Sequence, residues 1–198
     1  METYLKESGQ SVNIYLEANP NPNSLKFVVN FMLVPEGESY DFPDAESAQH
    51  APLAQELFGF PYVKRVFYMS NFVTVTKDEA VAWEDIQDEL KQHIKTYLEV
   101  GKPLLSKKAF EEPAHAPTEE DSEIVRNIKG ILDEYVRPAV EQDGGAIQFH
   151  SYDDGVVKLL LQGSCSGCPA SMVTLKAGIE NLLKRMLPEV KSVEAEGM

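Results

Sequence analysis

The sequence predicts an α+β protein made of two small domains, and three observations support this. The 198 residues are enough for two small domains, and the 43% hydrophobic and 25% charged content is that of an ordinary globular protein. Short alternating strand patterns occur beside longer helical ones. Residues 101–117 contain Pro103, Pro113 and Pro117 and show no periodicity. We therefore predict a first domain at residues 1–100, a linker at 101–117 and a second domain at 118–198.

The first domain is expected to be a small α+β sheet domain. Its strands alternate apolar and polar residues, and its longer helix repeats apolar residues at intervals of three and four. The predicted strands are residues 12–17, 25–33, 63–68 and 72–76, and the predicted helices are residues 48–58 and 82–100. The Asn-Pro-rich residues 19–23 are a turn by composition, and Gly101 is expected to end the second helix.

The second domain is expected to have the order αββαβ, with two helices on one face of a three-stranded sheet. A first helix begins after Thr118 and should end or kink at Pro138. Its apolar stripe is predicted to be Ile124, Ile128, Ile131 or Leu132, and Tyr135. The remaining elements are strands at residues 146–152 and 156–162, a helix at 169–187 and an edge strand at 190–194.

Charge and hydropathy exclude several classes of partner. The net charge of −14 disfavours binding to nucleic acid or to anionic lipid. No apolar run approaches the ~20 residues that a membrane-spanning helix needs. Residues 1–7 lack the patterns of signal and transit peptides, so the sequence predicts a cytoplasmic protein.

The chemistry of the chain centres on its two cysteines, Cys165 and Cys168. In a reducing compartment a pair at this spacing is expected to bind a metal or to be redox-active. Because Cys168 precedes Pro169, it is the natural N-cap of the following helix, whose dipole favours a thiolate. The small residues around the pair leave room for a bulky inorganic group.

Counting ligands suggests that two chains are needed. A cubane iron–sulfur cluster takes four thiolates and a structural zinc takes four donors, whereas one chain offers two sulfurs. Two chains related by a twofold axis would supply four. A cluster at such an interface is exposed and easily released, which suits a carrier. Zinc bound with His150 is a weaker alternative, because strand alternation places this histidine on the solvent face.

The second domain closely resembles the NifU-like (Nfu) C-terminal domain, an iron–sulfur cluster scaffold and carrier. The resemblance covers roughly residues 119–194 and rests on the Arg-Pro-Ala-Val-Glu-Gln-Asp-Gly-Gly run at 137–145 and the Gly-Ser-Cys-Ser-Gly-Cys-Pro-Ala-Ser run at 163–171. Many members of the family have an acidic residue where this chain has Ala146. The first domain is similar to the Nfu N-terminal domain at residues 19–27 and 73–77.

The resemblance implies that Cys165 and Cys168 of two subunits hold a [4Fe-4S] cluster in a homodimer. It further implies that the cluster comes from upstream assembly machinery and passes to apo iron–sulfur client proteins. The first domain has no cysteine, so its implied role is partner contact or structure.

Two other hypotheses stay open, a thiol–disulfide redox protein or sensor using the same pair, and a cluster-free interaction module. We find no nucleophile–base arrangement and no phosphate loop, so no catalytic activity is predicted. We interpret Gly144 and Gly145 as turn residues that need positive φ.

Overall fold

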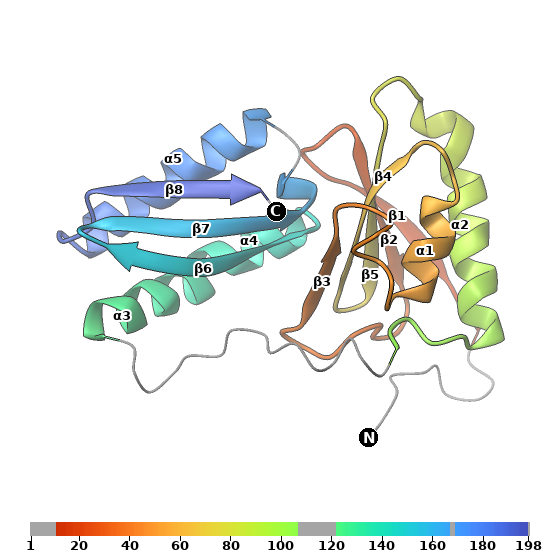
Figure 1. Ribbon diagram of the computed structural model, residues 1–198, viewed down its shortest axis with the longest axis horizontal. Helices are drawn as coiled ribbons and strands as arrows, with labels where there is room; N and C mark the ends of the chain where they lie inside the picture. The colour runs from red at the N-terminus through yellow and green to blue at the C-terminus, as the bar shows by residue number, and fades with distance from the viewer. Residues whose placement is uncertain (1–10, 107–121, 167–168, 198) are drawn as a thin grey trace. The chain divides into compact units, whose positions relative to one another are not determined.

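The computed structural model describes residues 11–106, 122–166 and 169–197, apart from the side chains of residues 169–171 (Figure 1). The chain divides into two compact units, Met1–Ala114 and His115–Met198. Each unit combines a small sheet with helices, so the predicted α+β class is confirmed.

Unit 1 is a five-stranded sheet with the order β1-β2-β5-β4-β3, and each neighbouring pair is antiparallel. Its strands are β1 (Ile14–Ala18), β2 (Ser24–Val29), β3 (Ser39–Phe42), β4 (Val63–Met69) and β5 (Phe72–Lys77). Its helices are α1 (Pro52–Phe58) and α2 (Trp83–Val100). Each predicted strand and helix has a counterpart here, and β3 is an additional strand that was not predicted.

The core of unit 1 lies between one face of the sheet and the two helices. Alternate strand residues such as Phe27, Val66 and Val73 are fully buried there, together with Leu53 of α1 and Leu90 of α2. This arrangement follows from the period of two in strands and the period of about 3.6 in helices.

The Asn-Pro-rich turn before β2 is fastened to the start of α2. Trp83 Nε1 donates a hydrogen bond to the carbonyl oxygen of Pro22 over 3.0 Å. Lys77 Nζ donates to Asn23 Oδ1 over 3.3 Å, and its ammonium lies 5.5 Å from the centre of the Trp83 ring. The turn therefore has a structural task, which is to join β2, β5 and α2.

The first residues of the predicted linker pack against unit 1. Gly101 adopts φ +75° and ends α2, as expected. Leu104 and Leu105 are buried in the first core, and Ser106 N donates to the carbonyl oxygen of His50 over 2.7 Å. Residues 107–117 lie outside the described residues, so their assignment as a linker stays a prediction.

Unit 2 has the expected αββαβ order, with two additions: a π-helical turn that divides the first helix and a 3-10 turn after its second strand. Its elements are α3 (Glu123–Ile131), a π-helical turn η2 (Leu132–Val136), α4 (Arg137–Gln142), β6 (Gly145–Asp153), β7 (Val156–Gly163), a 3-10 turn η3 (Ser164–Ser166), α5 (Pro169–Met186) and β8 (Ser192–Gly197). Strand β7 is central, antiparallel to β6 and parallel to β8 (Figure 1). Helix α5 is the crossover that a parallel pair requires. The predicted start of the first helix at Thr118 lies outside the described residues.

The π-helical turn changes which residues of the first helix are buried. Val136 is buried, whereas Tyr135, predicted to face the core, is 51% exposed. A π turn inserts one residue into the helical repeat, and so shifts the apolar stripe by one position. The same turn lets the helix pass Pro138, which occupies the first turn of α4, where a missing N–H is tolerated. The chain neither stops at this proline nor loses its packing.

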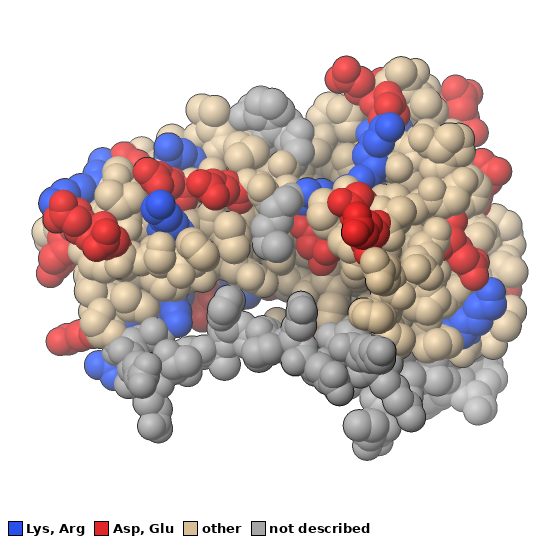
Figure 2. Space-filling view, in the orientation of Figure 1, with Lys and Arg blue, Asp and Glu red and all other residues tan. Residues whose placement is uncertain are grey.

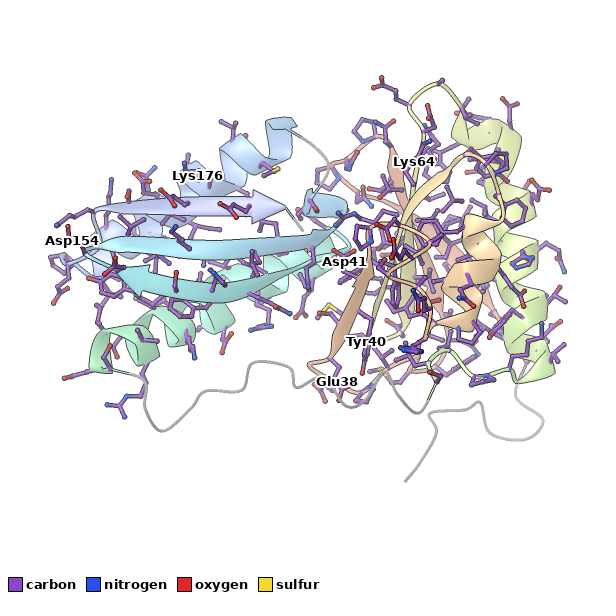
Figure 3. The ribbon with its side chains drawn as sticks, viewed as in Figure 1. Glu38, Tyr40, Asp41, Lys64, Asp154 and Lys176 are labelled. Carbon is purple, nitrogen blue, oxygen red and sulfur yellow. The ribbon has the colours of Figure 1, made fainter. Side chains whose placement is uncertain are left out.

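Strand β8 is tied to its neighbours at its start. The amides of Lys191 and Ser192 donate to the carbonyl oxygen of Gly155, and Val193 N donates to Glu180 Oε2 of α5 over 3.0 Å. Lys191 also forms a 2.8 Å ion pair with Asp154. Figure 3 shows Asp154 at the β6–β7 turn, at the end of the sheet away from η3.

Within the described ranges, no helix has the length and apolar character needed to cross a membrane. On the face of unit 2 shown in Figure 2, acidic and basic side chains are interspersed. Ion pairs of unit 2 include Lys158–Glu194 and Lys184–Glu180.

Candidate metal centre at the cysteine loop

The candidate site is the loop that follows the central strand β7. Cys165 occupies the middle of η3, is 6% exposed and belongs to the hydrophobic core of unit 2, called the second core below. Cys168 lies outside the described residues, so its predicted position as the N-cap of α5 is not tested. Helix α5 begins at Pro169, the residue directly after Cys168. The predicted pair therefore falls between the end of a strand and the start of a helix.

The turn at Asp143 and Gly144 supports this loop from one side. Ser164 Oγ donates a hydrogen bond to the carbonyl oxygen of Asp143, and Ser164 N donates to that of Gly144 over 3.3 Å. Gly144 has φ +78°, which confirms its interpretation as a turn residue. These contacts fix the residue that precedes Cys165.

Gly145 is a glycine for a different reason from the one predicted. The described residues with positive φ do not include it. A Cβ added to Gly145 would lie 2.6 Å from the carbonyl oxygen of Gln162 and 2.9 Å from Cys165 Sγ. The absence of a side chain therefore lets the start of β6 lie against the thiol. This contact joins the Asp-Gly-Gly motif to the cysteine motif and could not be read from either motif alone.

Ala146, where many members of the resembled family have an acidic residue, is buried opposite Gln162 in the β6–β7 ladder. A small apolar side chain suits this position, because a buried unpaired carboxylate is costly.

A zinc site within one chain gains no support from the structure. His150 is exposed, at a register shift of β6. It is five residues from Gly145, or about 17 Å along an extended strand. In the parts of the chain that the structure describes, no group of three or more His, Cys, Asp or Glu residues could hold a metal ion. Cys165 therefore lacks the additional ligands for a zinc site among the described residues.

Polar groups that the sequence analysis missed lie on β3 and β4 of unit 1. Arg65 forms a 2.7 Å ion pair with Asp41, whose side chain is almost fully buried. Tyr40 Oη donates to Glu38 Oε2 over 2.6 Å, and burial, followed by this bond, raises the pKa of Tyr40 well above its usual value (Figure 3). The arginine salt bridge joins β4 to β3, whereas the phenol bonds to a residue just before its own strand, and neither contact provides a metal ligand. These residues are therefore structural.

Two family models match the chain. The model described as the N-terminal domain of scaffold protein Nfu/NifU matches residues 14–101, and the NifU-like domain matches residues 128–194. The chain belongs to the Nfu/NifU family. The two matched ranges fall in units 1 and 2, respectively.

Curated relatives align with most of this chain. The protein named "NFU1 iron-sulfur cluster scaffold homolog, mitochondrial" of Drosophila willistoni is 45% identical, over 91% of this chain and 62% of its own length. Its Drosophila persimilis counterpart is 44% identical, over 93% of this chain and 65% of its own length. This Nfu/NifU chain thus spans less than two thirds of these relatives. A solution NMR structure of a NifU-like protein from Saccharomyces cerevisiae is 29% identical, covering 52% of this chain and 91% of that one, with a TM-score of 0.45.

The cytoplasmic prediction is contradicted by these names, since the relatives are called mitochondrial. That prediction rested on the absence of a targeting pattern in residues 1–7. Such an absence carries little weight when the relatives extend well beyond the aligned region. The comparison points to mitochondria instead.

Proposed function

We propose that this protein is an iron–sulfur cluster scaffold and carrier that binds a [4Fe-4S] cluster through Cys165 and Cys168 of two subunits. The proposal is supported by membership of the Nfu/NifU family and by the names of the relatives. The cluster is cargo, and the protein acts by holding and releasing it rather than by catalysing a reaction.

The observation that carries the proposal is the supply of ligands. The whole sequence contains two cysteines, both in the loop between β7 and α5, and a cubane cluster requires four thiolates. Two copies meeting at this loop would provide them. A homodimer is then the loaded form, and the separate chains are what remains after delivery.

Release to a client proceeds by exchange of thiolates. A client cysteine gives up its proton and forms a bond to iron, while the bond from Cys165 or Cys168 to the same iron breaks and the freed thiolate takes up a proton. Repeating this step four times moves the cluster without any change in its oxidation state. A ligand set divided between two chains favours this exchange, because separation of the subunits removes half of the ligands together.

The partners that this role requires are apo iron–sulfur proteins downstream and cluster-assembly machinery upstream. Unit 1 lacks cysteine and so cannot provide thiolates for the cargo. Its role in the proposal is to contact one of these partners. The net charge of −14 favours partners with basic surfaces around their cluster sites.

Anaerobic reconstitution of the full chain with ferrous iron and sulfide tests the proposal. We expect broad absorbance near ~400 nm, about four irons per two chains, and a dimer that appears with the cluster. The Cys165→Ser and Cys168→Ser variants should each fold but fail to retain iron. An apo iron–sulfur enzyme mixed with the loaded protein should gain activity as the absorbance leaves the carrier.

Two outcomes would contradict the proposal. The first is a protein that stays iron-free and monomeric under these conditions. The second is iron content unchanged in Cys168→Ser, which would place the cluster on other ligands. A colourless monomer that reduces a protein disulfide at a rate set by Cys165 and Cys168 would indicate thiol–disulfide exchange instead.

A further inference from the structure

Strand β8 ends beside the cysteine loop. It runs parallel to β7, and its last residue, Gly197, lies opposite Leu161 in the ladder. The chain leaves β7 at Gly163 and turns into η3, which contacts both β6 and β8. The loop is therefore flanked by the start of β6 on one side and by the end of β8 on the other (Figure 1).

The contact between β8 and the loop leaves no room for a side chain at residue 197. A Cβ added to Gly197 would lie 2.6 Å from the carbonyl oxygen of Ser166 and 2.7 Å from its Oγ. Real Cβ atoms essentially never approach other atoms so closely. Since one of the two atoms belongs to the backbone, rotation of the Ser166 side chain alone cannot relieve the overlap.

Strand β8 is paired with the central strand β7 as far as Gly197, whereas Ser166 lies outside this ladder. Three amides at its start are fixed by hydrogen bonds to Gly155 and Glu180, and Val193 is fully buried in the second core. Ser166 belongs to a single 3-10 turn, a short element with poorer hydrogen-bond geometry than an α-helix or a sheet. A side chain at residue 197 would therefore displace the loop before it displaced the strand.

We infer that Gly197 is a positioning residue for the cluster-binding loop, acting through Ser166. Its lack of a side chain lets β8 close against η3 and keeps Cys165 seated in the second core. The statement that this loop binds a cluster rests on the proposed function, whereas the contact between Gly197 and Ser166 does not. Gly197 lies beyond residues 128–194, which the NifU-like family model matches.

The reactivity of the Cys165 thiol in the cluster-free protein provides a test that needs no cargo. In a Cys168→Ser background, Cys165 is the remaining cysteine, and its labelling by a thiol-reactive dye under native conditions reports how often the loop opens. We expect Gly197→Ala to label roughly tenfold faster than its parent. The matched control is Gly178→Ala in α5, where an added Cβ has nothing within 4 Å. Its labelling rate should equal that of the parent.

A second variant separates displacement of the loop from general loss of structure. Ser166→Gly combined with Gly197→Ala removes the Oγ contact and frees the backbone at residue 166, so labelling should return part of the way to the parental rate. Far-UV circular dichroism and the urea midpoint should show that each variant is folded. Equal labelling rates in Gly197→Ala and Gly178→Ala would overturn the inference.

Cluster retention provides the second measurement. Loaded full-length Gly197→Ala with both cysteines present should lose iron to a chelator faster than the loaded Gly178→Ala control. If the parent protein never takes up a cluster, the proposed function fails, while the labelling rates still decide the role of Gly197.

Discussion

Gly145 and Cys165 are in contact although they lie in different motifs, and a methyl group on Gly145 would lie 2.9 Å from the sulfur. The same methyl group would lie 2.6 Å from the carbonyl oxygen of Gln162 in the neighbouring strand. Glycine is therefore required at residue 145 to leave space for the Cys165 thiol, and not to allow a positive φ in the turn. This contact explains in physical terms why an Asp-Gly-Gly turn accompanies a cysteine loop that begins 20 residues later.

Gly145→Ala tests this contact through stability. The added Cβ meets backbone that is part of the β6–β7 ladder, so the free energy of unfolding should fall by ~1–3 kcal/mol, the usual cost of overpacking. Gly130→Ala in α3 is the matched control, since an added Cβ there has nothing within 4 Å and alanine favours a helix over glycine by ~1 kcal/mol. Urea unfolding followed by circular dichroism measures both. Equal midpoints for the two variants would show that the sheet absorbs the methyl group without cost.

Glu180 gives unit 2 a dependence on pH. Its carboxylate forms a 2.6 Å ion pair with Lys184 and accepts the Val193 N–H over 3.0 Å, and these bonds lower its pKa. A lowered pKa means that the contribution to stability is present above the ordinary value of ~4.3 and is lost as pH falls through the folded value. We expect Glu180→Gln to be less stable than the parent by up to ~1 kcal/mol at pH 7, with the difference shrinking as pH falls below ~4.3 and disappearing only below the lowered folded pKa.

Urea midpoints measured at both pH values provide the check. Lys184→Gln keeps the hydrogen bond from Val193 N to Glu180 and removes only the ion pair. Its free energy of unfolding at pH 7 should therefore fall by less than that of Glu180→Gln. A difference between Glu180→Gln and the parent that was equal at neutral and acid pH would rule out the charge of this carboxylate as its cause.

The sequence predicted the elements with strong periodicity and missed those that tertiary contacts decide. Residues 83–100 and 156–163 were predicted within one residue, because apolar spacing alone defines a helix or a buried strand. Strand β3 was missed because four residues are too few to show a period. Its available signal was the alternation of Tyr40 and Phe42 after the turn at Gly37, which has φ +84°.

The failure at Tyr135 has a different cause. A regular helix would bury this residue, but the π turn shifts the repeat so that Val136 faces the core instead. Pro138 lacks an N–H and disturbs the helical hydrogen bonds before it, and a π turn is one way to accommodate this. The proline itself was the available signal. The close approaches at Gly145 and Gly197 had no local signal, since each involves a residue distant in sequence.

Leu90→Ala should weaken unit 1 without affecting cluster uptake. Leu90 is fully buried between α2 and the sheet, so its truncation should cost ~2–5 kcal/mol. Trp83 is the single tryptophan of the chain, and its ring is anchored to Pro22, so its fluorescence reports on unit 1. We expect a lower midpoint by fluorescence and an unchanged iron content after reconstitution, because both cysteines belong to unit 2. Leu183 is fully buried in the second core, so Leu183→Ala is the converse control and should weaken unit 2 instead. Loss of iron in Leu90→Ala but not in Leu183→Ala would contradict this division of roles.

Val173→Glu should weaken the cluster-bridged dimer. Val173 is 69% exposed near the start of α5, five residues after Cys168, so we expect a second copy that shares the proposed cluster to approach it. A glutamate there would add like charges to two chains that are each already at −14, and we expect the loaded dimer to dissociate ~10-fold or more readily. Met186→Glu introduces the same charge on a 42% exposed residue ~20 Å further along the helix and should leave dimerisation intact. Sedimentation of the loaded proteins measures both. Equal weakening by the two variants would point to net charge rather than proximity to the cysteine loop.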